Sequence, residues 1–172
     1  MSGASLCDMT TQHTHFPLKA LIFDVDGTLA DSERDGHLPA FNAAFRDEAL
    51  DWKWDEEFYG ALLRIAGGKE RLHYYAHSYA PQWLATPNAA DVIKRVHDSK
   101  TRHYQELLRA GRIELRPGVA RLITEARDAG LRLAIATTTM PDNVSTLLQT
   151  SLGSDSLHWF EVIGAGDVVA NK

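Results

Sequence analysis

The spacing of apolar and polar positions divides the chain into three stretches of different character. Residues 21–23 form a short apolar run, typical of a buried strand, that ends in two acids, Asp24 and Asp26. Residues 32–115 place apolar side chains at helical spacing and contain no convincing strand. From residue 116 onward, helical and strand-like patterns alternate. This order predicts an α/β chain in which a long helical segment separates the first strand from the rest of the sheet.

The helical segment is predicted from recurring apolar positions. One helix face is indicated by residues at the i, i+4, i+7 and i+8 positions, namely His37, Phe41, Ala44 and Phe45. The sequence GGKER at residues 67–71 interrupts the pattern. Another helical run is expected over about residues 89–110.

The last third of the chain predicts alternating helices and strands. Pro117 suits the first position of a helix that Gly130 is placed to end. Short strands are expected over residues 131–136 and 160–163, with a helix over about residues 141–149 between them. Strands separated by helices predict a parallel sheet with right-handed crossovers.

Asp24 and Asp26 occupy alternate positions at the point where the first strand ends. In a strand, residues i and i+2 point to the same side, so both carboxylates would converge at the carboxyl end, where open α/β sheets bind ligands. Gly27 permits the tight turn that must follow. The simpler alternative is that both acids only cap a turn. A buried strand seldom ends in closely spaced acids without a cation or proton to relieve them, so the pair favours a catalytic site.

Length and composition narrow the class of protein. A chain of 172 residues can bury one core, so one domain with an insertion is expected. The net charge of −5, without a basic block, argues against nucleic acid or an anionic membrane as the main partner. No apolar run reaches the length of a membrane span. The single cysteine, Cys7, cannot form an internal disulfide, which favours a cytoplasmic location.

The sequence DVDGT at residues 24–28 resembles the first motif of the haloacid dehalogenase phosphatase superfamily. The resemblance implies a Rossmann-like core with a parallel sheet, made of residues 19–31 and 116–172. Residues 32–115 would form an inserted helical cap, and residues 1–18 a flexible tail before the core.

The same resemblance implies a role for each acid. Asp24 would be the nucleophile that forms an aspartyl-phosphate, and Asp26 would protonate the leaving oxygen and later activate water. Mg²⁺ would lie between Asp24 and the phosphate, with the backbone carbonyl of Asp26 as a further ligand.

Within the superfamily, the cap resembles that of the β-phosphoglucomutase-like branch. Several segments are similar to the CbbY-type sugar-bisphosphate phosphatases: AFNAAF at 40–45, GGKER at 67–71, KTRHY at 100–104, LRPGV at 115–119, AIATTT at 134–139 and AGDVVA at 165–170. This resemblance implies a phosphorylated sugar as substrate, such as the ketopentose bisphosphate xylulose 1,5-bisphosphate.

The resemblance also implies binding residues. Thr137 matches the second motif, and with the amide of Thr138 it would hold phosphate oxygens. Glu33 and His37 match positions that face the sugar, although residues 34–36 include one residue more than the family pattern. The positive charges of two further side chains would meet the distal phosphate, unless they belong to a solvated turn; these are Lys69 and Arg71.

The family pattern continues beyond this chain. Its third motif is a lysine before Pro-x-Pro, and its fourth is an acidic pair on another strand, whereas this chain ends at Asn171 and Lys172. The expectation is therefore a core that lacks its last strands and a first strand with an uncovered edge. Three functions stay open: an Mg²⁺-dependent sugar-phosphate phosphatase, a phosphomutase with the same aspartates, and an inactive fragment of such an enzyme. The sequence does not decide the oligomeric state.

Overall fold

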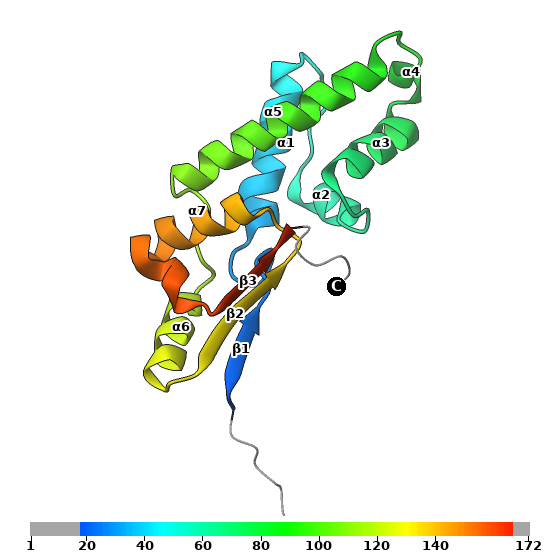
Figure 1. The fold of residues 1–172 in the computed structure, drawn as a ribbon. Helices are drawn as coiled ribbons and strands as arrows, with labels where there is room; N and C mark the ends of the chain where they lie inside the picture. Colours follow the sequence, from blue (N-terminus) through cyan, green and yellow to red (C-terminus); the bar gives the residue numbers. More distant parts are fainter. Residues whose placement is uncertain (1–17, 167–172) are drawn as a thin grey trace, which may run out of the picture.

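The computed structural model of the protein describes residues 18–166. Cys7, the expected tail up to residue 17 and the terminal Lys172 lie outside these residues. The strands are β1 (Ala20–Phe23), β2 (Arg132–Thr137) and β3 (Val162–Ala165). The helices are α1 (Leu38–Asp47), α2 (Glu56–Leu62), α3 (Gly68–Tyr79), α4 (Pro81–Leu84), α5 (Ala89–Arg109), α6 (Val119–Asp128) and α7 (Pro141–Leu152) (Figure 1). A π-helical turn, η1 (Glu33–His37), precedes α1, and a 3₁₀ turn, η2 (Ser154–Trp159), follows α7.

The strands form the expected parallel sheet. Within the described residues its order is β1-β2-β3, with β2 hydrogen-bonded to both neighbours. β2 begins and ends one residue later than the pattern predicted. β3 begins at Val162 instead of residue 160, because the N–H of Phe160 still donates to Leu157 and closes η2.

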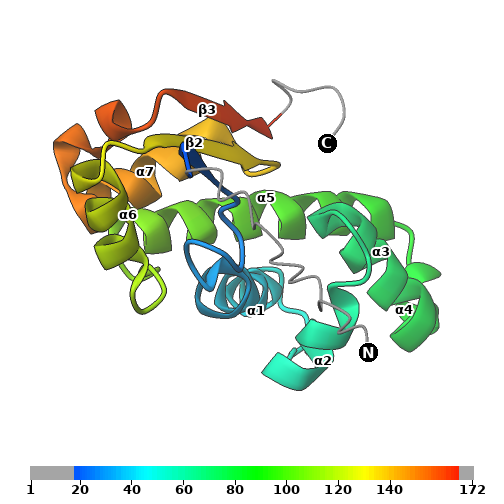
Figure 2. The ribbon, with the colours of Figure 1, turned by 90° about the horizontal axis from the view of Figure 1, so that it is seen from below.

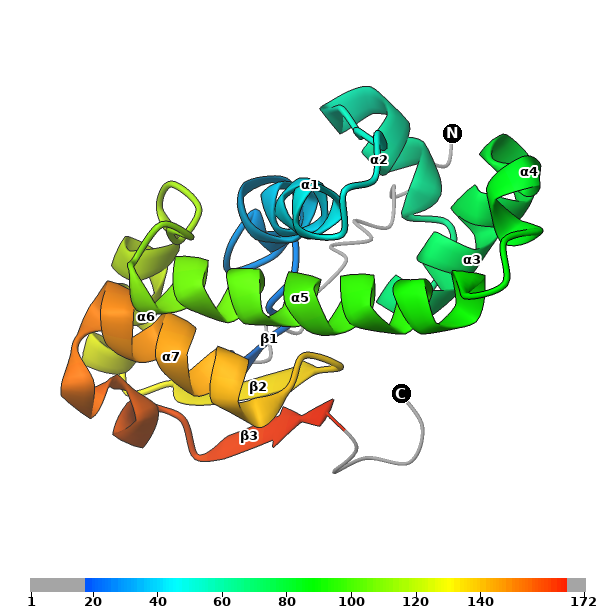
Figure 3. The same cartoon turned by 90° about the horizontal axis from the view of Figure 1, so that it is seen from above.

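The helices lie on one side of this sheet, as Figures 2 and 3 show. Leu133 and Ile135 point to that side and are 1% exposed. Ile22 and Val162 point to the opposite side and are 71% and 61% exposed. β1 is an edge strand in this part of the chain, as expected.

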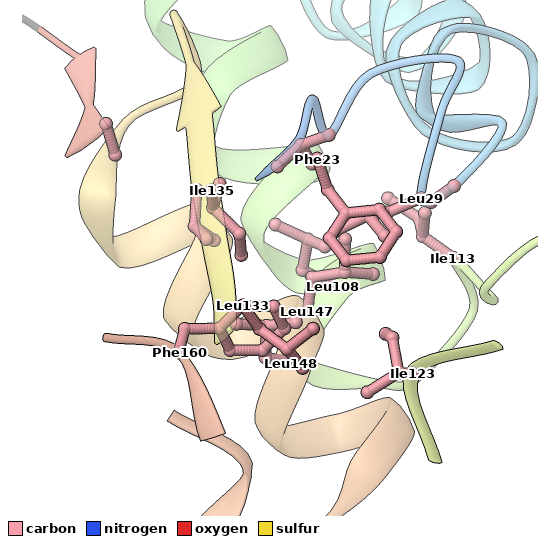
Figure 4. Packing of buried hydrophobic residues seen from close by; sticks show 14 of the residues in the cluster. Phe23, Leu29, Leu108, Ile113, Ile123, Leu133, Ile135, Leu147, Leu148 and Phe160 are labelled. Carbon is pink, nitrogen blue, oxygen red and sulfur yellow. The ribbon is translucent and has the colours of Figure 1, made fainter. Parts of the chain in front are cut away.

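The covered face of the sheet packs against α5, α6 and α7 around one hydrophobic cluster (Figure 4). The cluster joins residues that are far apart in the sequence, among them Phe23, Leu29, Leu108, Ile113, Ile123, Leu133, Ile135, Leu147, Leu148 and Phe160. Burial of this surface at roughly 25 cal/mol per Å² supplies the driving force that holds the strand ends in register.

A second cluster, rich in aromatic side chains, fills the segment between β1 and β2. It contains Phe41, Phe45, Trp52, Trp54 and Tyr59, and Phe41 and Phe45 are fully buried, as the helical spacing predicted. Residues 32–115, all of which the structure describes, form no strand. Their assignment to an inserted cap stays a prediction.

Helix α5 belongs to both clusters. Ile93 and Val96 pack in the aromatic cluster, whereas Tyr104 and Leu108 pack beneath the sheet. Figures 2 and 3 show α5 between the sheet and α1. The predicted core and the predicted cap therefore share one long helix. The domain boundaries stay a proposal.

Glycines set the start of two helices differently from the expectation. Gly67 has a φ of 89°, and α3 begins at the next residue, so the sequence GGKER opens a helix as well as interrupting the pattern. Gly118 has a φ of 88°, and α6 begins at Val119 instead of Pro117. A left-handed residue cannot continue an α-helix, which explains both starting points.

Among residues 18–166, no helix combines the length and apolar character needed to cross a bilayer.

Candidate active site

The predicted acids lie at the carboxyl end of β1. Asp24 directly follows the strand and is half-buried, while Val25 between the acids is 1% exposed. The chain then turns at Gly27, whose φ is 74°. Because β1 pairs in parallel with β2, the residues that follow both strands meet at one edge of the sheet.

Arg116, in the segment before α6, binds the turn that follows the acids. Its N–H donates to the carbonyl of Leu29 at 2.8 Å, and its Nη1 donates to the carbonyl of Gly27 at 2.5 Å. Its Nε lies 3.3 Å from a carboxylate oxygen of Asp31. The loop that carries the acids is thereby tied to the segment before α6.

The carboxylate of Asp26 is held from two sides. The hydroxyl of Ser32 donates to Oδ1, and the hydroxyl of Thr139 donates to Oδ2 at 2.5 Å. The Thr137 hydroxyl donates in turn to Thr139 at 3.2 Å and is itself buried. The Thr triplet thus contacts Asp26 through Thr139, which the motif comparison did not select.

Beside Asp26 the structure has a hollow of about 370 Å³. It is lined by Asp26, His37, Gly68, His97, Lys100, Thr101, Tyr104, Thr138, Thr139, Met140 and Asn143. The lining comes from the loops after β1 and β2, from η1, from the start of α3, from α5 and from the first turn of α7. Of the residues predicted from the sequence, Asp26, His37 and Thr138 belong to it.

Lys100 supplies a positive charge to this hollow that the sequence analysis missed. The side chain is buried, with its Nζ 5.1 Å from the ring centre of Phe41 and 5.4 Å from that of Tyr104. Burial lowers the pKa of Lys100 to about 8; the nearby Arg71 also lowers it, while the charge of Glu33 raises it. The signal was present in the sequence, since Lys100 interrupts a stripe of apolar positions on α5.

His97 adds a titratable group to the same wall. Its side chain is half-buried, and burial lowers its pKa, with further lowering from the charges of Lys100 and Lys69. Lys69 itself is exposed and lies outside the lining of the hollow.

His37 packs flat on Tyr104, with ring centres 4.0 Å apart and an angle of 18° between the planes. Its Nδ1 is buried and makes no hydrogen bond. Burial holds the pKa of His37 well below its usual value, and the charges of Lys100 and Arg71 lower it further. The neutral ring can donate through one nitrogen and accept through the other.

Glu33 and Arg71 meet through Tyr59 inside the cap. The Tyr59 hydroxyl donates to Glu33 at 2.6 Å and accepts from Arg71 at 2.7 Å, and burial raises its pKa. Arg71 Nη1 lies 3.8 Å from Glu33 and the side chain is 8% exposed. Arg71 is therefore engaged within the cap, whereas Lys69, two residues earlier, is exposed. The structure brings Glu33 and Arg71 together. It places Lys69 and Arg71 in different environments, with Lys69 in solvent and Arg71 buried.

The acids suit Mg²⁺ by their chemistry. Mg²⁺ prefers oxygen ligands and is usually bound through one or two carboxylates, with water and substrate phosphate completing its shell. Asp24 and Asp26 supply such oxygens at the open edge of the sheet. Among residues 18–166, no group of three or more His, Cys, Asp or Glu side chains is placed so that it could hold a metal ion.

The chain is similar to known proteins in both sequence and structure. Residues 18–172 match the haloacid dehalogenase-like hydrolase family. The plasmid-encoded protein CbbY of Cupriavidus necator is 56% identical over 138 residues, which cover 80% of this chain and 54% of that protein. Crystal structures of CbbY from Rhodobacter sphaeroides, one with phosphate and a variant with xylulose 1,5-bisphosphate, are 43% and 42% identical, each with a TM-score of 0.70. They cover 91% of this chain and 67% of theirs.

The chain thus spans between about half and two thirds of the length of these relatives. Its parallel sheet, the acids at the end of β1 and the match over residues 18–172 all lead to one assignment. The chain belongs to the haloacid dehalogenase-like hydrolase family.

Proposed function

We propose that this protein is an Mg²⁺-dependent phosphatase of sugar bisphosphates, with a ketopentose bisphosphate such as xylulose 1,5-bisphosphate as substrate. The observation that carries the proposal is the hollow beside Asp26, which joins an acid to buried positive charge. The similarity to a CbbY that was crystallised with xylulose 1,5-bisphosphate supports the choice of sugar. A cytoplasmic location remains a prediction that rests on the lone Cys7.

The proposed reaction has two steps. In the first, a carboxylate oxygen of Asp24 attacks phosphorus, the bond to the sugar oxygen breaks, and Asp26 gives that oxygen a proton. In the second, Asp26 takes a proton from water, whose oxygen attacks the aspartyl-phosphate and releases phosphate from Asp24. Mg²⁺ held by Asp24 and the backbone carbonyl of Asp26 would neutralise the phosphate charge that otherwise repels a carboxylate.

The remaining residues of the hollow suit a second, non-reacting phosphate. Lys100 and His97 face the hollow from α5, and a buried cation binds an anion more strongly than an exposed one because water screens it less. Thr138 faces the hollow at the end of β2, and with Thr137 it is proposed to bind the reacting phosphate. Lys69 and Arg71 stay predicted ligands of the distal phosphate, and Glu33 and His37 predicted ligands of the sugar.

The test uses this chain and a chimera in which the part of Rhodobacter sphaeroides CbbY that it does not cover follows it. The chimera should release phosphate from sugar bisphosphates, and Asp24→Asn should lower the rate by on the order of 10⁴, or about 5.5 kcal/mol of barrier. The exposed Asp128→Asn on α6 is the control and should leave the rate unchanged.

Two outcomes would go against the proposal. Near-normal turnover by Asp24→Asn would show that another group attacks phosphorus. An isomerised monophosphate in place of free phosphate would identify a phosphomutase.

A further inference from the structure

The segment between the acids and the cap contains one π-helical turn, η1 (Glu33–His37). The N–H of Leu38 donates to the carbonyl of Glu33, five residues back instead of the four of an α-helix. One additional residue in an α-helix would rotate everything after it by about 100°, whereas a π turn confines the change to one bulge. Glu33 and His37 therefore both keep partners in the cap and α5, namely Tyr59 and Tyr104.

The residue inside this bulge is Gly36, which is buried. A Cβ at this position would lie 2.5 Å from Cδ1 of Ile113 and 2.7 Å from Cε2 of Tyr104. Its φ is outside the left-handed region, so the backbone conformation itself would accept alanine. The requirement for glycine at this position is therefore one of space.

Of the two neighbours, Tyr104 has the less freedom to move. Cδ1 of Ile113 is the end of a flexible side chain, but the Tyr104 ring is 3% exposed and lies flat against His37 at 4.0 Å. A methyl group at Gly36 would push the Tyr104 ring out of this position. The absence of a side chain at residue 36 and the position of the His37 ring therefore both depend on where Tyr104 packs.

The position of the His37 ring matters because the ring forms part of the wall of the hollow. Nδ1 is buried without a hydrogen-bond partner, which is costly unless a ligand uses it. The charged groups that act on the ring are Lys100 on α5 and Arg71 on α3, and both favour the neutral imidazole.

We propose that Gly36 is a positioning residue: by leaving the π turn without a side chain, it lets Tyr104 close against His37 and fixes the imidazole in the wall of the hollow. The inference rests on the proposed function at one point: it takes His37 to be a ligand of the substrate's sugar. The effect of Gly36 acts through His37, so it is separate from the chemistry of the aspartates.

The experiment compares Gly36→Ala with Gly60→Ala in the 172-residue chain. Gly60 lies in α2, a Cβ there would have no atom within 4 Å, and its φ is likewise outside the left-handed region. Helix propensity should raise the Tm of Gly60→Ala by about 2 °C, while overpacking should lower that of Gly36→Ala by about 4 °C.

The decisive measurement is the NMR signal of the His37 ring. In the parent chain and in Gly60→Ala, the ring protons should show the upfield ring-current shift that stacking on Tyr104 causes, and the ring should stay neutral. In Gly36→Ala the shift should be lost and the pKa of His37 should rise toward its ordinary value. A second variant, Tyr104→Leu, removes the stacked ring without a collision, and its readout is the pKa of His37, which should rise as in Gly36→Ala. It decides the question if Gly36→Ala does not fold.

Unchanged His37 signals in a folded Gly36→Ala, or an unchanged pKa of His37 in Tyr104→Leu, would overturn the proposal, even if the Tm falls, since the glycine would then serve packing alone. Kinetics of the chimera separate this result from the proposed function. Gly36→Ala should raise KM for a sugar bisphosphate about tenfold and leave hydrolysis of p-nitrophenyl phosphate, which has no sugar, unchanged. Absence of all turnover would count against the proposed function, while the NMR result would still decide the role of Gly36.

Discussion

At the scale of single residues, buried charge is the feature that distinguishes this site. Lys100 is only 9% exposed and faces the hollow that contains Asp26. A charged amine in such surroundings loses the favourable free energy of hydration. The cation–π contacts with the rings of Phe41 and Tyr104 offset part of this loss. The chain therefore gives up stability to keep a cation at this position.

Replacing Lys100 by methionine should stabilise the chain at neutral pH. The pKa of Lys100 is lowered from 10.5 to about 8, so between these values the unfolded state binds more protons and stability rises with pH. Below pH 8 the buried charge of Lys100 lowers the free energy of unfolding by its full amount, about 3 kcal/mol. Denaturant unfolding at pH 7 should show Lys100→Met to be more stable by up to this amount, and the difference should vanish near pH 10.5.

Lys94→Met is the matched control, because Lys94 lies on the same helix with its side chain 70% exposed. It should change stability little at either pH. A gain for Lys100→Met that is equal at both pH values would contradict the account of a desolvated cation.

Asp24 and Asp26 could be identified from the sequence because their relation is local, two positions apart at the end of a strand. The contact of Asp26 with Thr139 was not predictable, since it joins residues 113 apart and depends on which of three threonines turns toward β1. The position of Arg71 inside the cap was missed for the same reason, because its partners Glu33 and Tyr59 come from other elements.

At the scale of elements, α1 and the segment before α2 are joined by one side chain. Asn42 donates to the carbonyl of Trp54 at 2.8 Å and accepts from its N–H at 2.9 Å. The pair of bonds fixes Trp54 between Phe41 and Phe45, with ring centres 4.9 Å apart in both cases. The aromatic cluster of the cap thus depends on a polar residue at its margin.

Asn42→Ala should destabilise the chain by about 2 kcal/mol, because both backbone groups of Trp54 lose their partner. Asn88→Ala is the control, since Asn88 precedes α5 without a capping bond from its side chain. Urea unfolding of both variants measures the difference. An Asn42→Ala chain as stable as Asn88→Ala would show that the bonds to Trp54 contribute nothing.

The elements themselves were largely predictable, and their irregular ends were not. The helical spacing of Phe41, Ala44 and Phe45 identified α1, and Pro141 identified the start of α7. The comparison with the family pattern indicated one additional residue at 34–36, but not that it forms a π turn before α1. The fit of that turn depends on tertiary contacts around Gly36, where a Cβ would meet Ile113 and Tyr104.

At the scale of the whole molecule, residues 18–166 cover one face of the sheet and leave the other open. The side chains of Ile22 and Val162 lie on the open face, and β1 forms one edge. The chain also spans 54% of the length of its Cupriavidus relative. The parallel order of the strands followed from alternating helices and strands. The sharing of α5 between two clusters did not, because the spacing of apolar residues on one helix does not show which cluster each part of the helix contacts.

Hydrogen exchange should reflect the position of each strand. Amides of β2 pair on both sides and should exchange only through opening of the whole sheet, whereas amides of β1 that point away from β2 should exchange close to the rate of an unprotected chain. Exchange of the 172-residue chain followed by NMR resolves the two sets. Equal protection of every β1 amide would show that the open edge is paired, and concentration dependence would identify a second copy as the partner.

The central claim is that Asp24 carries the phosphoryl group during turnover, and trapping that group tests it most directly. The chimera is mixed with a sugar bisphosphate and Mg²⁺, quenched in acid before one turnover is complete, digested and analysed by mass spectrometry. The account predicts a phosphoryl adduct on the peptide that contains Asp24, which decays as free phosphate appears and is absent from Asp24→Asn. Turnover without an adduct on that peptide, or an adduct that persists in Asp24→Asn, would contradict it.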